Sequence, residues 1–171
     1  DIAYNNHDLE DGLRAGLFSI EKLSSLPLIS KIIIKHLKNI KNFKKEIIIS
    51  QIIRDLINIM VTDVIKTTNK NLKFIKPKTI NDIYNIDRNI VQFSVKMKET
   101  DNQIKEFLMQ NMYNHKKVII NTNKGRKILS DLFKHLLKNP KKYINKYFLK
   151  NESKERLISD FIAGMTDRYA I

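Results

Sequence analysis

The chain has 171 residues and a hydrophobic content of 42%, which is enough for one helical domain with a core of its own. The absence of cysteine excludes disulfides, thiolate nucleophiles and thiolate zinc sites, and it fits a cytoplasmic address. No apolar run reaches the roughly 18 residues of a membrane-spanning helix, and the formal net charge of +14 suits polyanions such as nucleotides or nucleic acids.

Apolar residues recur at helical spacing along nearly the whole chain, and only four glycines and three prolines interrupt the pattern. We therefore expect an all-α multi-helix bundle without internal repeats. The first helix lies in residues 1–18. A short helix follows from residue 26 toward residue 37, and the lysine-rich residues 38–45 form its exposed end and a connection.

A long helix with a buried apolar stripe is predicted for residues 46–68, at the centre of the fold. Residues 70–78, which include Pro77, are the clearest loop. The sequence Thr79-Ile-Asn-Asp82 resembles a capping box and predicts the start of a short helix. Another long helix is predicted for residues 91–113.

Two more helices are predicted, over residues 124–137 and residues 153–169, and Asn139-Pro140 ends the first of them. The basic residues 121–127 can be interpreted as a helix entrance that holds an anion. Exposed capping residues and lysines explain the same run equally well. A solvated lysine face is also the simpler interpretation of the overall charge, and we prefer it to a dedicated nucleic-acid surface.

Three polar residues of the first helix share one face, namely Tyr4, Asp8 and Asp11. Side chains four residues apart lie one above the other on a helix, so Tyr4 and Asp8 can contact two parts of one ligand. On the residues alone, a half-buried Tyr4 and a solvated Asp8 without a function remain the alternative.

The residues around this face carry a longer motif. The chain begins Asp-Ile-Ala-Tyr-Asn-Asn-His-Asp-Leu-Glu-Asp-Gly-Leu over residues 1–13, and it ends Asp160-Phe-Ile-Ala-Gly-Met-Thr-Asp-Arg-Tyr-Ala-Ile171. Both segments resemble the HD-domain deoxynucleoside triphosphate (dNTP) triphosphohydrolases, the dGTPase-like family. Weaker matches lie between them, in residues 57–64, residues 107–115, Leu132-Phe133 and Pro140. The resemblance covers essentially the whole chain, but only the C-terminal part of a family member.

The resemblance implies one helical region over residues 1–171, in which residues 1–18 are the end of the active-site helix and residues 19–171 are the C-terminal helical region. The family reaction releases triphosphate and a deoxynucleoside, through attack of a metal-activated water on the α-phosphorus. By resemblance, Tyr4 lies along the triphosphate, where a phenol can donate to a phosphate oxygen. The resemblance likewise implies that Asp8 accepts a hydrogen bond from the sugar 3′-hydroxyl.

The resemblance also implies a divalent metal ion in the complete enzyme, but none held by this chain alone. The family's carboxylate ligand stands four residues before Tyr4, which falls immediately before Asp1. A register shifted by one residue would make Asp1 the ligand, and both alternatives stay open. The dipeptide His7-Asp8 does not correspond to the metal-binding His-Asp pair of the family, which lies upstream together with a further histidine.

An independent zinc or iron site is not expected, because the four histidines form no pair at helical spacing and have no acidic partner at ligand spacing. We interpret His36 and His135 as surface residues of lysine-rich helices, and His115 as a residue at a helix end.

Three arginines could meet phosphate through a forked, two-point contact. Arg14 gives a weak signal, and Arg168 fits a structural salt bridge with Asp167 or Asp160 equally well. Arg54 interrupts the apolar stripe of the central helix, so it is the third candidate substrate-binding residue.

We therefore expect part of a dNTP triphosphohydrolase that is inactive alone, with Tyr4, Asp8 and Arg54 as substrate-binding residues and no catalytic residue. The expected partners are a dNTP and a missing N-terminal HD segment; assembly into a homo-oligomer is left open, and no membrane is expected. The less favoured alternative is a non-catalytic basic helical module for oligomer assembly or nucleic-acid binding. A His and then a His-Asp pair upstream in the reading frame would separate the two.

Overall fold

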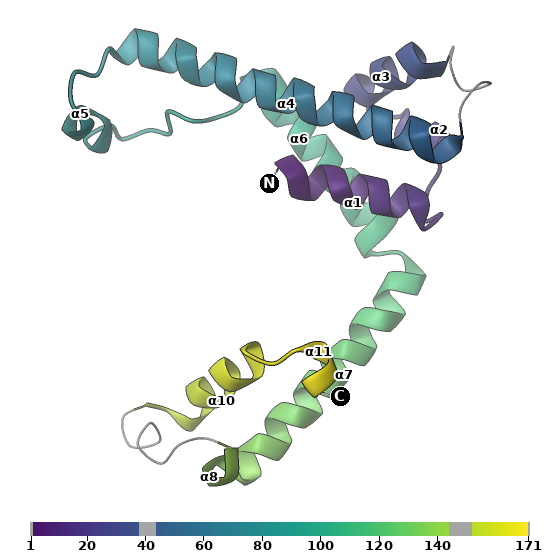
Figure 1. Cartoon of the computed structure of the whole chain (residues 1–171), viewed down its shortest axis with the longest axis vertical. Helices are drawn as coiled ribbons and strands as arrows, with labels where there is room; N and C mark the ends of the chain where they lie inside the picture. The colour runs from purple at the N-terminus through teal and green to yellow at the C-terminus, as the bar shows by residue number, and fades with distance from the viewer. Residues whose placement is uncertain (1, 38–43, 144–151, 171) are drawn as a thin grey trace. The chain divides into compact units, whose positions relative to one another are not determined.

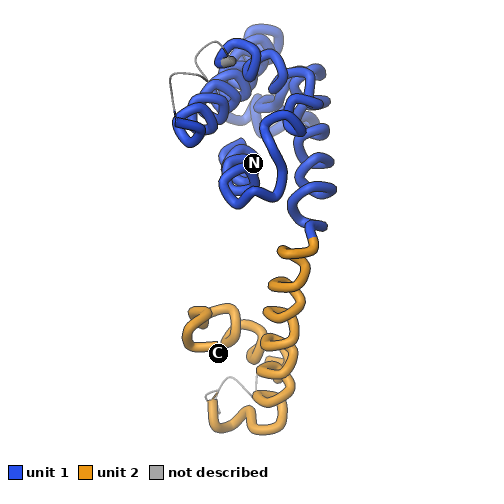
Figure 2. Tube along the Cα trace, turned by 90° about the vertical axis from the view of Figure 1, so that its right-hand side faces the viewer, with its two compact units in different colours: residues 1–115 blue, residues 116–171 orange. Residues whose placement is uncertain are grey.

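The computed structural model describes residues 2–37, 44–143 and 152–170. These residues form helices and their connections, with no strand in any of the three ranges, which confirms the all-α prediction. The chain divides into two compact units, unit 1 over residues 1–115 and unit 2 over residues 116–171 (Figure 2). The sequence pattern gave no sign of this division, and the single helical region stays a prediction.

Unit 1 contains the longest helix and the helices packed around it. α1 packs against α4 and α6, and α3 packs against α4, whereas α5 lies beyond the C-terminal end of α4 (Figure 1). The buried side chains at this junction are almost all Leu, Ile, Met and Phe. The elements in chain order are α1 (Ile2–Arg14), α2 (Ile20–Leu23), α3 (Pro27–Leu37), α4 (Lys45–Ile75), α5 (Ile80–Tyr84), α6 (Val95–Leu108) and the π-helical turn η1 (Met109–Tyr113).

The end of α1 is a Schellman motif, which explains why this helix is shorter than the predicted segment 1–18. Leu17 donates its backbone N–H to the carbonyl of Gly12 at 2.9 Å, and Gly16 donates to Leu13 at 3.3 Å. Gly16 has a φ of +65°, a left-handed conformation that glycine adopts without steric cost. The turn reverses the chain and places Phe18 in the core beside α1.

The central helix is longer than predicted. α4 continues through residues 69–75, although residues 70–78 were predicted as a loop, and it ends where Lys76 takes a left-handed φ of 50°. The capping box at Thr79 and Asp82 is confirmed: each side chain accepts a hydrogen bond from the backbone of the other residue.

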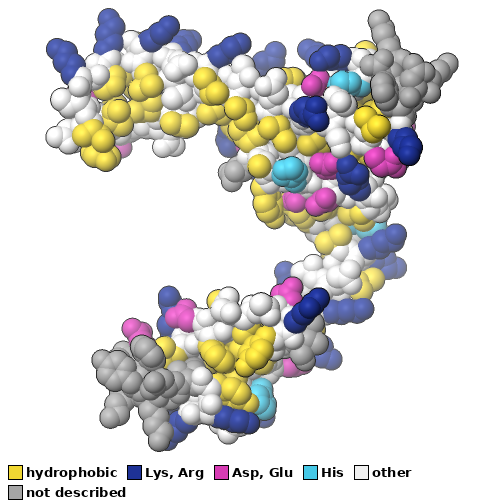
Figure 3. All heavy atoms as spheres, viewed as in Figure 1, with side chains coloured by type: hydrophobic (Ala, Val, Ile, Leu, Met, Phe, Trp, Pro, Cys, Tyr) yellow, Lys and Arg dark blue, Asp and Glu magenta, His cyan; other side chains and the backbone are white. Residues whose placement is uncertain are grey.

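Large apolar side chains stay exposed at this end of unit 1. Figure 3 shows hydrophobic side chains gathered over the C-terminal half of α4 and over α5. α5 has no buried residue. The exposed side chains are Val61, Ile65, Phe74, Ile80, Ile83, Tyr84, Val91 and Val95.

The next helix begins later than the predicted residue 91. α6 starts at Val95, because Ser94 caps it by accepting a hydrogen bond from the backbone of Met97. Asp63 of α4 in turn accepts hydrogen bonds from the backbone and the hydroxyl of Ser94, at 2.8 and 2.7 Å. This interaction fixes the start of α6 against the middle of α4.

Unit 2 consists of α7 (Lys116–Lys138), α8 (Pro140–Tyr143), α10 (Lys154–Ala163) and α11 (Asp167–Ala170), and α10 packs on α7. α7 starts eight residues before the predicted residue 124. Residues 121–127 therefore lie inside a helix, so of the two interpretations left open the helix entrance that holds an anion is wrong. The predicted helix over residues 153–169 is two helices, because the chain turns after Gly164. In the described ranges, no helix has the length and apolarity needed to cross a bilayer.

Candidate functional site

The first two candidate residues lie on α1 as the sequence predicted, one turn apart. Tyr4 is exposed over 67% of its surface, and Asp8 is half-buried. The predicted alternative of a half-buried Tyr4 therefore does not describe this structure. A ligand that carries both a charged and a neutral polar group can contact the exposed phenol with one group and the half-buried carboxylate with the other.

A third residue joins them from a distant part of unit 1. The Tyr113 hydroxyl, at the end of η1, donates a short hydrogen bond to Oδ2 of Asp8. Burial raises the pKa of Tyr113 well above its ordinary value, and the hydrogen bond and negative charge of Asp8 raise it further, with a smaller contribution from Tyr4. The raised pKa favours the protonated phenol, which acts as the donor in this hydrogen bond. We call Tyr4, Asp8 and Tyr113 the Tyr-Asp-Tyr cluster.

The asparagines between Tyr4 and Asp8 explain how α1 is held in place. Asn5 is buried and donates from Nδ2 to Oδ1 of Asp101 on α6 at 3.0 Å. Asn6 is also buried, and its Nδ2 lies 2.7 Å from the carbonyl of Ile2 and 3.3 Å from the sulfur of Met60 on α4. Adjacent side chains of one motif thus attach α1 to both neighbouring helices.

The buried partner of Asn5 is a charged group. Asp101 is only 1% exposed, and its Oδ2 accepts hydrogen bonds from Lys105 at 2.9 Å and Lys98 at 3.3 Å. Burial opposes ionisation of Asp101, but the hydrogen bonds and charges of these two lysines outweigh it and hold its pKa below the ordinary value. An ionised Asp101 therefore accepts the hydrogen bond of Asn5 and fixes α1 on α6.

The C-terminal end of α1 is also attached to α4, through a network of polar side chains. Arg14 donates to Oε1 of Glu10 at 2.6 Å and to the hydroxyl of Ser50 at 2.9 Å, and Ser50 donates to Glu10 at 3.2 Å. The hydrogen bond of Arg14 is the main reason that the pKa of Glu10 is lowered. Arg14 is thus engaged with its own helix and α4 rather than held free for phosphate.

The other two candidate arginines have no described contact with the cluster. Arg54 is exposed on α4, and across the described ranges no hydrogen bond or ion pair joins it to Tyr4 or Asp8. Its role in substrate binding stays a prediction. Arg168 is exposed on α11 of unit 2, and Asp160, one of its two proposed partners, pairs instead with Arg156 at 3.0 Å.

The histidines do not form a metal site in the part of the chain that the structure describes. That part contains no group of three or more His, Asp or Glu residues able to hold a metal ion. Asp1, the alternative metal ligand, lies outside the described residues. His36 is not a surface residue as predicted: its side chain is only 14% exposed, and Nε2 lies 3.1 Å from Oδ2 of Asp55. His135 is exposed, as predicted.

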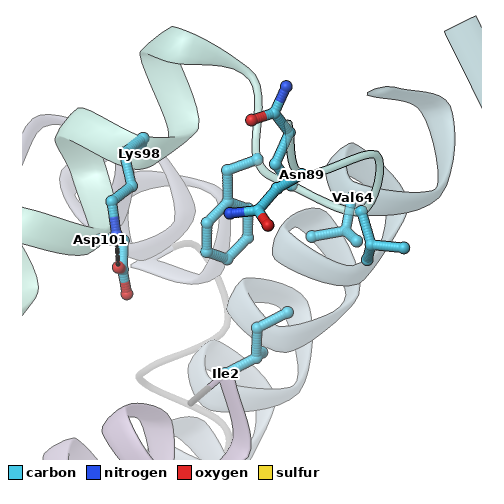
Figure 4. A pocket seen from close by; sticks show the side chains of 8 residues that line it. Ile2, Val64, Asn89, Lys98 and Asp101 are labelled. Atoms are coloured by element: carbon cyan, nitrogen blue, oxygen red, sulfur yellow. Dashed lines mark hydrogen bonds and ion pairs between the residues drawn. The ribbon is translucent and has the colours of Figure 1, made fainter. Parts of the chain in front are cut away.

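A separate cavity of about 600 Å³ opens where α1, α4 and α6 meet (Figure 4). Ile2, Val64 and Lys98 come to it from three different helices, and Asn89 comes from the connection before α6. Lys98 is paired with Asp101 at the wall of this cavity. None of the Tyr-Asp-Tyr cluster lines it.

Sequence reasoning missed Tyr113 as a site residue. It is 105 residues from Asp8, and helical periodicity relates only neighbours along one helix. The available signal was the weaker family match in residues 107–115, which includes Tyr113 but says nothing about its contact.

Comparison with known proteins bears on the whole chain. Residues 91–171 match the phosphohydrolase-associated domain. The full chain is 48% identical to the deoxyguanosinetriphosphate triphosphohydrolase-like protein of Pelagibacter ubique and covers 46% of that protein. It is 35% identical over 176 residues to the protein of the same name from Parvibaculum lavamentivorans, and 36% identical over 177 residues to that from Agrobacterium fabrum, covering 44% of each.

The chain thus spans less than half the length of these relatives. Its similarity to the Pelagibacter ubique protein nevertheless extends over all of its 171 residues, and thus over unit 1 as well as unit 2. The chain is therefore a homologue of the deoxyguanosinetriphosphate triphosphohydrolase-like proteins, which confirms the family resemblance predicted from its sequence.

Proposed function

We propose that the complete protein carrying this chain is a metal-dependent dNTP triphosphohydrolase, which converts a dNTP to a deoxynucleoside and triphosphate. The observation that supports this most directly is the pairing of Tyr4 and Asp8 on one face of α1, within the segment that carries the family motif. The names of the relatives point to dGTP as the first substrate to test.

The chemistry of the two side chains suits different parts of a dNTP. A phenol is a neutral donor that can approach a phosphate oxygen, so the exposed Tyr4 is the proposed contact of the triphosphate. A carboxylate repels phosphate but accepts hydrogen bonds well, so Asp8 is the proposed contact of the neutral 3′-hydroxyl of the sugar. Arg54 is proposed as a further phosphate contact because it is exposed and always charged.

The metal ion of the proposed reaction is not assigned to residues of this chain. The described residues offer no set of ligands that fits a divalent ion. The chain's proposed contribution is therefore to bind and orient the substrate, and we expect it to be inactive when produced alone. Partners beyond the dNTP are proposed on family resemblance only: an N-terminal HD segment and further copies of the protein.

Steady-state assays of the complete polypeptide with each common dNTP and several divalent ions test the proposal. We expect hydrolysis of at least one dNTP, and Asp8→Ala should lower kcat/KM by about 10-fold to 100-fold, as expected for loss of a hydrogen bond to a charged group. Asp131→Ala, an exposed aspartate of α7 in unit 2, is the matched control and should keep the wild-type rate. An unchanged rate for Asp8→Ala would remove Asp8 from the substrate site.

A further inference from the structure

Tyr113 has no function in the proposed scheme, although its hydroxyl donates a hydrogen bond to the Asp8 carboxylate. The two residues come from different ends of unit 1, Asp8 from α1 and Tyr113 from the turn after α6. Their hydrogen bond therefore connects the proposed sugar contact to a part of the fold that carries no other residue of the site.

The backbone at Tyr113 departs from a regular helix. Residues 109–113 form the π-helical turn η1, closed by a hydrogen bond of 3.1 Å from the backbone of Asn114 to the carbonyl of Met109. A π turn fits one more residue into the turn than an α-helix does, so it changes the directions of the side chains that follow, and such turns are frequent at functional sites. Here the turn aims a half-buried tyrosine at α1.

The ring and the hydroxyl of Tyr113 make different contacts. The ring packs against the hydrophobic core of unit 1, which restricts its motion. The hydroxyl occupies one of about four acceptor positions of the Asp8 carboxylate, which leaves positions for a second donor. A fixed donor on one side of a carboxylate restricts the rotation of that carboxylate about its own side chain.

We propose that Tyr113 is a positioning residue, which holds the Asp8 carboxylate in the orientation that accepts a hydrogen bond from the 3′-hydroxyl of a deoxyribose. The inference rests on the proposed function, because it takes the sugar as the ligand of Asp8. Under this proposal Tyr113 is a specificity determinant, because recognition of the 3′-hydroxyl depends on the contact between α1 and η1. The raised pKa of Tyr113, which burial and Asp8 cause, favours the protonated donor that this role requires.

The discriminating readout is the preference for a 3′-hydroxyl, measured as the ratio of kcat/KM for dGTP to that for 2′,3′-dideoxyguanosine triphosphate, with the complete polypeptide. Tyr113→Phe keeps the ring and removes the donor. We expect it to lower kcat/KM for dGTP by about 10-fold and to change that for the dideoxy substrate by less than about 3-fold. The matched control is Tyr143→Phe, which removes the hydroxyl of a half-buried tyrosine in unit 2 and should leave the ratio unchanged.

A purely structural role for Tyr113 would lower both rates together and leave the ratio at its wild-type value, and that result would overturn the inference. The Asp8→Asn variant distinguishes a failure of this inference from a failure of the proposed function. If Asp8→Asn reduces the ratio and Tyr113→Phe does not, only the inference fails; if neither variant changes the ratio, the sugar contact itself fails as well.

The double variant gives a second, independent measurement. If Tyr113 acts through Asp8, Tyr113→Phe should have no further effect on the ratio once Asp8→Asn is present. Additive effects of the two changes would contradict the inference, because they would show that Tyr113 contributes without Asp8. Circular dichroism of each variant verifies that the helices are retained.

Discussion

The close approach of Phe18 to Gly12 makes a specific prediction about the helix that carries Tyr4 and Asp8. A Cβ atom added at Gly12 would lie 2.5 Å from Cζ of Phe18 and would also overlap Cε1 of the same ring. Phe18 is buried and packs edge-to-face on Phe107 of α6, with ring centroids 5.0 Å apart. The ring therefore cannot move away from Gly12→Ala without disturbing the contact between the turn after α1 and α6.

The expected magnitude follows from two opposing effects. Replacing glycine by alanine inside a helix stabilises the folded state by about 0.5–1 kcal/mol. Overpacking a core costs about 1–3 kcal/mol, and the overlap with two ring atoms places Gly12→Ala in the upper half of that range. We therefore expect a net loss of about 1–2.5 kcal/mol in the free energy of unfolding, equivalent to a Tm lower by about 2–10 °C.

Thermal unfolding followed by far-ultraviolet circular dichroism measures this loss. Gly125→Ala is the matched control, because a Cβ at this mid-helix position of α7 meets no atom within 4 Å. That variant should gain about 0.5–1 kcal/mol from the helix preference of alanine. If Gly12→Ala is as stable as wild type or more stable, Gly12 is not required by the packing of Phe18 and the reasoning is refuted.

Two further predictions concern the attachment of α1. Gly16→Ala should destabilise the protein by about 1 kcal/mol, because the φ of +65° is unfavourable for alanine, although the added Cβ meets no atom within 4 Å. Urea unfolding measures this loss, and equal midpoints for variant and wild type would contradict it. The lowered pKa of Asp101 means that its carboxylate stabilises the fold above an unfolded pKa of about 3.9 and that this contribution is lost as the pH falls through the lowered folded value. Asp101→Asn should therefore be less stable than wild type near neutral pH, with a difference that narrows below a pH of about 4; a difference independent of pH would show that the charge is not what stabilises α1 on α6.

The sequence was most informative where one helix carries the whole signal. The face shared by Tyr4 and Asp8 follows from the period of a single helix, and the capping box at Thr79 follows from four consecutive residues. Both are present in the structure, because neither depends on how distant segments pack.

The helix boundaries that were mispredicted depend on context that local patterns lack. Polar residues such as Asn121 resemble a helix start but lie inside α7, where they face solvent and no packing opposes them. α6 begins at Val95 because Asp63, 31 residues earlier, holds its capping Ser94. In both cases the boundary is set by contacts, or by their absence, beyond the local sequence.

Long-range contacts also explain what was missed in the candidate site. Asn5 and Asn6 appear in the sequence only as part of a motif, and their attachments to Asp101 and Met60 emerge from the packing of three helices. The hydrogen bond of Tyr113 to Asp8 depends in addition on a π-helical turn, which changes the direction of the tyrosine side chain. Periodicity of 3.6 residues cannot predict such a direction.

Identification of the products formed from dGTP by the complete polypeptide tests the central proposal most directly. Anion-exchange chromatography, with a divalent ion present, separates triphosphate from diphosphate and phosphate. The proposal predicts deoxyguanosine and intact triphosphate in equal amounts, with the rate lowered by Asp8→Ala. Release of phosphate or diphosphate with a deoxyguanosine phosphate, or no turnover of any dNTP, would contradict it.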